Sequence, residues 1–167
     1  MAENHIKVTQ GFRILLQGLT PYIARELRMA FGVNWWEKGV LQPLYDEQKR
    51  NLPNSGEWKE LVDSLDVQVA LILFADVHWR EIFQKKLSKD HRAWANELKG
   101  TRNKLAHLGG DDFSDEDTWR ALDTMARLLE EIDYEGTEEI RALLRDFRYG
   151  SANGSTTITE TASVPSN

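Results

Sequence analysis

Apolar residues recur at three- and four-residue intervals along most of this 167-residue chain, and that spacing constrains its fold more than any other feature. Residues spaced in this way share one face of an α-helix, so each run predicts a helix with one buried side. The clearest run is formed by Phe12, Leu15, Leu16, Leu19, Ile23, Leu27 and Phe31. We therefore predict an all-α fold, a compact helical bundle, over residues 8–149.

Capping and breaking residues predict where the first helices begin and end. Thr9 is a suitable N-cap for the first helix, and Gly32 is a suitable end. Pro21 lies inside this helix and is expected to kink or split it, because proline lacks a backbone N–H. Asn34 is expected to cap a second helical start, and the Pro- and Gly-containing residues 52–56 predict a loop.

The segment 67–77 is apolar on nearly every side, which predicts a fully buried central helix. A buried strand is the alternative, since Val and Ile favour strands. The helical spacing continues through Trp79, Ile82, Phe83 and Leu87, which favours one long helix. Ser88 is expected to cap the helix that follows, and that helix is expected to run to about Leu108.

Two further helices are expected after the Gly109-Gly110 pair. Ser114 is a suitable N-cap, and three acidic residues follow it in the first turn, where the helix dipole favours negative charge. Gly136 is expected to break this helix, and Thr137 to cap the last one. Residues 150–167 contain one charged residue and no aromatic residue, so we expect a flexible tail or a linker there.

Composition excludes several classes of site. The chain has no cysteine, so disulfides, thiolate zinc sites, iron–sulfur clusters and a cysteine nucleophile are ruled out. It contains neither a P-loop nor an HExxH motif. The acidic residues between 111 and 117 are expected to solvate a loop and cap helices, so we predict no metal and no cofactor. Without a signal sequence or a membrane-spanning run, a cytoplasmic protein without membrane contact is expected.

The acidic net charge is unevenly distributed. The chain has 21 Lys and Arg against 27 Asp and Glu, a net charge of −6, which excludes a protein that coats nucleic acid. Residues 85–107 nevertheless contain seven basic and two acidic residues, a local charge of +5. The rest of the chain is therefore at −11, and a small basic surface is predicted around residues 85–107.

The segment 101–107, which reads TRNKLAH, combines a cation, an amide and an imidazole on the last turns of one predicted helix. Arg102 and His107 are five residues apart, about 140° around the helix axis, so one chain presents them splayed. Two copies about a twofold axis would surround one cleft with two Arg and two His, which suits phosphodiester cleavage. The structural alternative is a helix-terminal His and an Arg paired with a carboxylate such as Glu97.

The motif from Arg102 to His107 resembles the HEPN superfamily, the higher eukaryotes and prokaryotes nucleotide-binding domains, whose active members carry Arg, a polar residue and then His. The chain is most similar to the branch named after a eukaryotic nuclear endoribonuclease of mRNA surveillance, which in prokaryotes often precedes large ATPases and helicases. The blocks that carry the resemblance are GLTPYIARELRMAFG, Asn34-Trp35-Trp36, DVHWREIFQKKL, ELKGTRNKLAHLGG and DTWRALDTMARLLEEI.

This resemblance implies metal-independent cleavage of RNA that leaves a 2′,3′-cyclic phosphate, at a site assembled across a homodimer. Arg102 and His107 take the catalytic roles, and Asn103 positions the His or the phosphate. Glu97 is expected to orient Arg102, and Lys104 to support the site with its charge. The alternative is a non-catalytic dimerisation module attached to a downstream ATPase or helicase domain.

Overall fold

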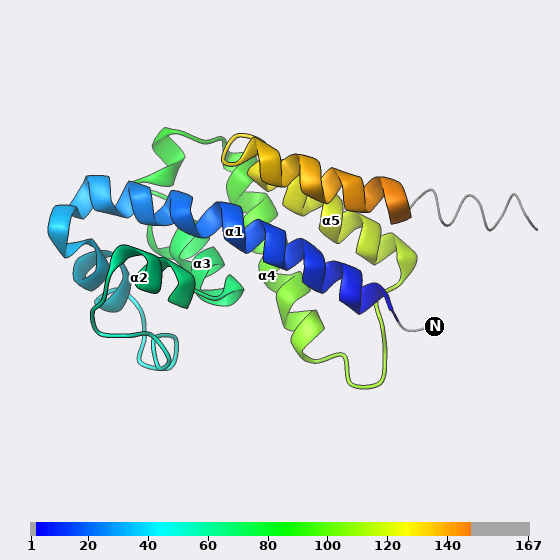
Figure 1. Ribbon diagram of the computed structural model, residues 1–167, viewed down its shortest axis with the longest axis horizontal. Coiled ribbons are helices and arrows are strands. Elements are labelled where there is room, and N and C mark those ends of the chain that lie inside the picture. Colours follow the sequence, from blue (N-terminus) through cyan, green and yellow to red (C-terminus); the bar gives the residue numbers. More distant parts are fainter. Residues whose placement is uncertain (1–2, 148–167) are drawn as a thin grey trace, which may run out of the picture.

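The longest helix, α1 (Asn4–Phe31), crosses the front of the molecule from end to end in the computed structural model, which describes residues 3–147 (Figure 1). Its buried stripe contains five of the seven residues that the spacing predicts, whereas Leu16 and Phe31 are half-buried. The stripe residues Val8, Phe12, Leu15, Leu19, Ile23 and Leu27 are all buried. They pack mainly on α5 (Asp115–Leu129) and on α3 (Val67–Ile72), so α1 joins the two halves of the core.

The remaining elements surround α1. The helix α2 (Trp58–Ser64) follows two irregular turns, Gly32–Asn34 and Glu37–Leu41, and a loop. A π-helical turn, Leu73–Val77, extends α3, and a short 3-10 turn, Phe83–Lys85, precedes α4 (Lys89–Ala106). A last helix, 134–147, lies beside α5 at the top of Figure 1. No strand occurs in residues 3–147, which confirms the all-α prediction.

Several predicted helix ends are confirmed. Gly32 ends α1 with a φ of 68°, a backbone conformation that glycine adopts without strain. Ser88 occupies the N-cap position of α4, although its hydroxyl bonds to the ring of His91 and not to a backbone N–H. Ser114 caps α5, where its side chain accepts a hydrogen bond from the N–H of Asp117. Each of these ends depends on residues that are neighbours in the sequence.

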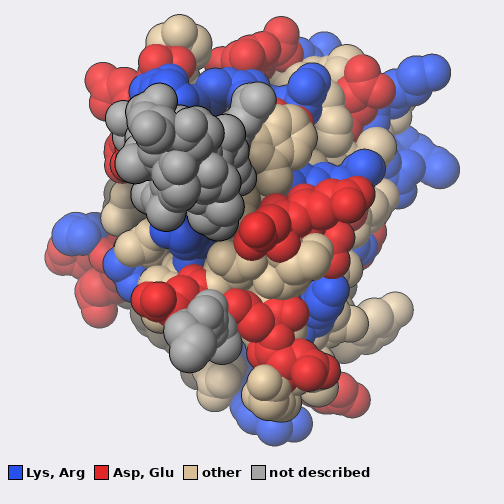
Figure 2. Space-filling view, turned by 90° about the vertical axis from the view of Figure 1, so that its right-hand side faces the viewer, with Lys and Arg blue, Asp and Glu red and all other residues tan. Residues whose placement is uncertain are grey.

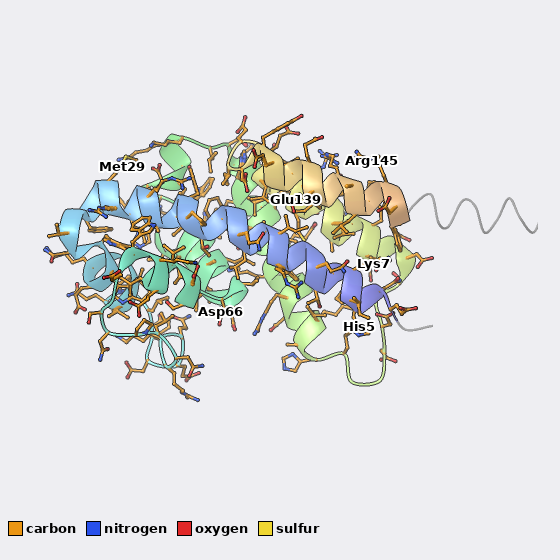
Figure 3. The ribbon with its side chains drawn as sticks, in the orientation of Figure 1. His5, Lys7, Met29, Asp66, Glu139 and Arg145 are labelled. Carbon is orange, nitrogen blue, oxygen red and sulfur yellow. The ribbon has the colours of Figure 1, made fainter. Side chains whose placement is uncertain are left out.

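The predicted start of α1 at Thr9 is wrong, and the reason is a contact across the fold. Asp112, in the loop before α5, accepts hydrogen bonds from the N–H groups of Asn4 and His5, at 2.8 and 2.7 Å. These two donors would otherwise lack partners, because the first N–H groups of a helix have none within it. Figure 3 shows His5 at this first turn of α1. Thr9 lies one turn inside, and its hydroxyl donates to the carbonyl of His5.

The predicted split of α1 at Pro21 is also wrong, because the helix continues through it to Phe31. Proline removes one backbone hydrogen bond and its ring crowds the carbonyl one turn earlier, but the other hydrogen bonds of the helix stay intact. Pro21 lies between two buried residues of the helix, Thr20 and Ile23. Burial on both sides keeps the helix continuous here.

The long helix predicted through Leu87 ends instead at Val77, and turns follow it. His78 is buried, and its ring Nε2–H donates to the carbonyl of Gly39 at 2.6 Å. Burial lowers the pKa of His78, although the bond to Gly39 opposes this shift, so the ring is held neutral. Trp79 and Phe83 reach Phe74 from these turns, with ring centroids 5.6 and 4.8 Å away. Burial of these rings therefore explains the apolar spacing without a helix.

The predicted break at Gly136 does not occur, because residues 134–147 form one helix that includes Gly136 and Thr137. Thr137 is buried and does not act as a cap; its hydroxyl donates to the carbonyl of Ala126 in α5. The predicted linker, 150–167, lies outside the described residues. Within residues 3–147, no helix is both long and apolar enough to cross a membrane.

We expect Asp112→Asn to lower the melting temperature by several degrees, because one oxygen that accepts from α1 becomes an amide donor. Desolvation raises the pKa of Asp112, but hydrogen bonds from Asn4, Phe113 and His5 outweigh it and hold the pKa below the ordinary range. The stabilisation of the fold by the ionised Asp112 carboxylate is therefore present at neutral pH and is lost as the pH falls through the folded-state pKa of Asp112.

Thermal unfolding followed by circular dichroism between pH 3 and pH 7 measures this effect. Asp111→Asn is the matched control, because Asp111 is exposed in the same loop and caps no helix. Equal melting temperatures for Asp112→Asn and Asp111→Asn at pH 7 would contradict the capping role.

Candidate functional site

The predicted motif lies on the last two turns of α4, where the helix leaves the core. Upstream, His91, Ala95 and Leu98 are buried and hold the helix against the rest of the bundle. From residue 99 to the end of α4, every side chain is exposed or half-buried. The helix ends at His107, its C-cap residue, and Gly109 turns the chain away with a φ of 63°.

His107 is exposed and held at one of its two ring nitrogens. Its Nδ1 lies 2.9 Å from the backbone carbonyl of Asn103, one turn earlier. A carbonyl can only accept a hydrogen bond, so Nδ1 carries a proton, and in the neutral ring Nε2 is the nitrogen with the lone pair. Within residues 3–147 no hydrogen bond engages Nε2. The ring is therefore oriented and open to a substrate.

Arg102 is half-buried on the side of α4 that faces α3. In the described part of the chain its guanidinium makes no hydrogen bond and no ion pair. The neighbouring lysines differ: Lys99 lies 2.6 Å from Asp76, and Lys104 lies 3.0 Å from Asp117. Arg102 thus keeps its charge available for an anion such as phosphate.

Glu97 does not contact Arg102, contrary to the predicted orienting role. Its carboxylate lies 2.6 Å from Nη2 of Arg120 and accepts a second 2.6 Å hydrogen bond from the hydroxyl of Thr124. The bond from Arg120 lowers the pKa of Glu97; desolvation raises it, and Thr124 lowers it further. Glu97 therefore ties α4 to α5, and its effect on the site is through the position of α4.

Lys104 also faces α5. Its ammonium group pairs with Asp117 and lies 5.1 Å from the centroid of the Phe113 ring. The ion pair and the hydrogen bond lower the pKa of Asp117. Lys104 consequently contributes less free positive charge to the motif than its sequence position predicts, and it supports the site mainly by fixing the first turn of α5.

The basic surface predicted over residues 85–107 is partly neutralised. Besides Lys99 and Lys104, Lys86 pairs with Glu26 on α1 at 3.0 Å. Figure 2 shows the end of the molecule where α1 begins and the last helix ends, and acidic and basic side chains are mixed across it. The part of the chain that the structure describes therefore offers a local cation at Arg102, with mixed charge on the face that Figure 2 shows.

Side chains that the sequence did not single out lie beside Arg102. Gln48 comes from the loop before α2, and Gln68 from the first turn of α3, and both line a hollow with Arg102 and Asn103. Gln48 and Gln68 are 20 positions apart, and both are at least 34 positions from Arg102, so nothing in their spacing marks them. Only the packing of α3 against α4 brings them together.

The described residues contain no group of three or more His, Asp or Glu side chains placed to hold a metal ion. Three of the acidic residues between 111 and 117 have structural partners: Asp112 caps α1, Asp115 accepts from Asn4, and Asp117 pairs with Lys104. The interpretation of this cluster as helix capping agrees with these contacts.

A family model described as Swt1-like HEPN matches residues 10–133. The chain belongs to this family. The match runs from α1 to the end of α5 and includes the motif from Arg102 to His107. No curated protein and no solved structure matches the chain. The resemblance to HEPN domains drawn from the sequence is therefore confirmed.

We expect Thr124→Val to destabilise this HEPN domain by about 1–3 kcal/mol, because it removes a buried hydrogen bond to the Glu97 carboxylate. Glu97→Gln is expected to destabilise it as well. The pKa of Glu97 is lowered in the folded state, so the ionised carboxylate stabilises the fold. The difference in free energy of unfolding between Glu97→Gln and wild type is therefore largest at neutral pH and disappears as the pH falls through that pKa.

Denaturant unfolding at pH 7 and at pH 3–4 measures both effects. Thr9→Val is the matched control, because its exposed hydroxyl bonds only within its own helix. If Thr124→Val unfolds at the same denaturant concentration as Thr9→Val, the link between α4 and α5 does not depend on this bond.

Proposed function

We propose that this HEPN domain is a metal-independent endoribonuclease whose site is completed by a second copy of the chain. One observation carries the proposal. In the described residues 3–147, an imidazole with an unbonded Nε2 and a guanidinium without a partner lie on the same exposed helix end, in a chain that belongs to a HEPN family. These two groups are the ones that cleavage of an RNA phosphodiester requires.

The proposed reaction needs no group beyond the side chains. Nε2 of one His107 takes the proton from the 2′-hydroxyl, and the 2′-oxygen attacks the adjacent phosphorus. The bond between phosphorus and the 5′-oxygen breaks as the protonated His107 of the second copy donates a proton to that oxygen. A 2′,3′-cyclic phosphate and a 5′-hydroxyl result, and Arg102 stabilises the charge on the phosphate oxygens.

The role of Asn103 follows from its position. Its backbone carbonyl holds the Nδ1 proton of His107, which sets both the tautomer and the direction of the ring. Its side chain is exposed and lines a hollow with Arg102. These contacts support a role for Asn103 in positioning His107, and we expect its amide to donate to the phosphate that Arg102 binds.

The second copy is proposed because of the helix geometry. Arg102 and His107 lie about 140° apart around α4 and about 7.5 Å apart along it, so one chain directs them to different sides. The face of α4 between them carries Asn103 and Ala106, and both of these residues are exposed. A second α4 can therefore approach this face closely and bring its own His107 toward Arg102.

We expect purified protein to cleave single-stranded RNA in the presence of EDTA. His107→Ala should reduce the rate by about 10²–10⁴-fold, the usual value of acid–base catalysis. Arg102→Ala should reduce it by about 10²–10³-fold, because it removes stabilisation of the phosphate charge.

Gel analysis of labelled RNA measures the rates, and circular dichroism checks the fold. Lys89→Ala is the control, an exposed cation on the same helix. Equal cleavage by His107→Ala and wild type would reject the proposal.

Mixing two inactive variants tests whether the site is shared between copies. If Arg102 of one chain acts with His107 of the other, a heterodimer of Arg102→Ala and His107→Ala keeps one such pair although it lacks the second His107, so a mixture should cleave RNA faster than either variant alone and slower than wild type. If both groups act within one chain, no intact pair forms and the mixture stays inactive.

Light scattering on the same samples measures the mass of the protein in solution and so distinguishes a monomer from a dimer. A dimer that cleaves no RNA would favour the non-catalytic interaction module. A monomer that cleaves RNA would remove the second copy from the mechanism.

A further inference from the structure

A divided surface hollow adjoins Arg102 on the side of α4 away from α5. One lobe, about 370 Å³, lies between the loop before α2 and the first turn of α3. The other lobe, about 250 Å³, continues along α4 to Asn103. Both lobes are lined by Gln48, Gln68, Ile72 and Arg102. The larger lobe falls within the range of about 300–1,000 Å³ that is usual for small-molecule sites.

The walls of this amide hollow are rich in neutral polar groups. Side-chain amides come from Gln48, Asn51, Gln68 and Asn103. The amide oxygen of Gln48 accepts a 2.8 Å hydrogen bond from the N–H of Tyr45, so its NH₂ group is oriented and available to donate. Ile72, half-buried, supplies an apolar floor. Amides that can donate and accept, around an apolar floor, suit the flat face and polar edge of a nucleobase.

The acidic residues of the hollow have their own partners, except for one at its rim. Asp66, labelled in Figure 3, begins α3 and accepts a hydrogen bond from the N–H of Val69. Asp76 lies 2.6 Å from Lys99. Glu47 is exposed at the rim. Neutral amides therefore predominate beside the guanidinium of Arg102. A nucleotide needs this arrangement, because its phosphate binds a cation and its base, next to the phosphate, binds neutral polar groups.

We infer that the amide hollow binds the nucleobase attached to the phosphate that Arg102 contacts, and that Gln48 and Gln68 determine which nucleotide is cleaved. This inference rests on the proposed ribonuclease function. Gln48 and Gln68 are specificity-determining residues and move no proton. Discrimination between bases by a well-placed amide is about 5- to 100-fold, and this sets the size of the expected preference.

The first test is cleavage of a randomised single-stranded RNA followed by sequencing of the new ends. Wild-type protein should show at least a fivefold bias at the nucleotide beside the cleaved bond. Gln68→Ala and Gln48→Ala should each flatten this bias, and Gln68→Glu should shift it toward bases that donate a hydrogen bond.

Gln17 is an exposed glutamine on α1 outside the hollow, so the control variant Gln17→Ala should leave the bias unchanged. An unchanged bias in Gln68→Ala and Gln48→Ala would overturn the inference while leaving the ribonuclease proposal intact.

The second test does not require cleavage. The four nucleoside monophosphates are titrated into ¹⁵N-labelled protein, and the side-chain NH₂ signals are followed by NMR. Signals of Gln48 and Gln68 should move, with different apparent affinities for the four bases, and Gln17 should not. If these signals move in a protein that cuts no RNA, the base site stands and the ribonuclease proposal falls. If no nucleotide moves them, the base site is rejected.

Discussion

The burial of one face of α1 is the interaction on which the rest of the structure depends. Leu15, Ile23 and Leu27 are at most 1% exposed, and each such side chain contributes about 1.5–3 kcal/mol when it is fully buried. The first half of α1 packs on α5 and the second half on α3. Because α4 packs between α3 and α5, its position relative to both is set by this one long helix.

The candidate site uses the consequences of that packing. One side of α4 is fixed to α5 through Glu97, Arg120 and Thr124, so the helix end is held firmly. The opposite side meets α3 only in part and leaves the amide hollow beside Arg102. Lys104 joins the last turn to the first turn of α5, while His107 at the end of the helix stays exposed. A helix end that is rigid yet uncovered is what a shared site between two copies would need.

Local features of the fold could be predicted, and distant ones could not. Ser114 and Gly32 mark helix ends because a cap acts on residues one to three positions away. The true start of α1 depends on Asp112, more than a hundred residues downstream, and no local signal reveals it. The end of the predicted long helix at Val77 depends likewise on the bond between His78 and Gly39.

The sequence by itself determined the all-α fold, the position of the motif on the end of a helix, and the membership of a HEPN family, because periodicity and motif spacing are properties of neighbouring residues. Only the tertiary structure decided which charges are free. Glu97 and Arg102 are near in sequence, but the carboxylate lies closer in space to Arg120, and Lys99 and Lys104 meet carboxylates on other elements. A charged side chain pairs with the partner nearest to it in space, so the fold, and not the spacing, left Arg102 available.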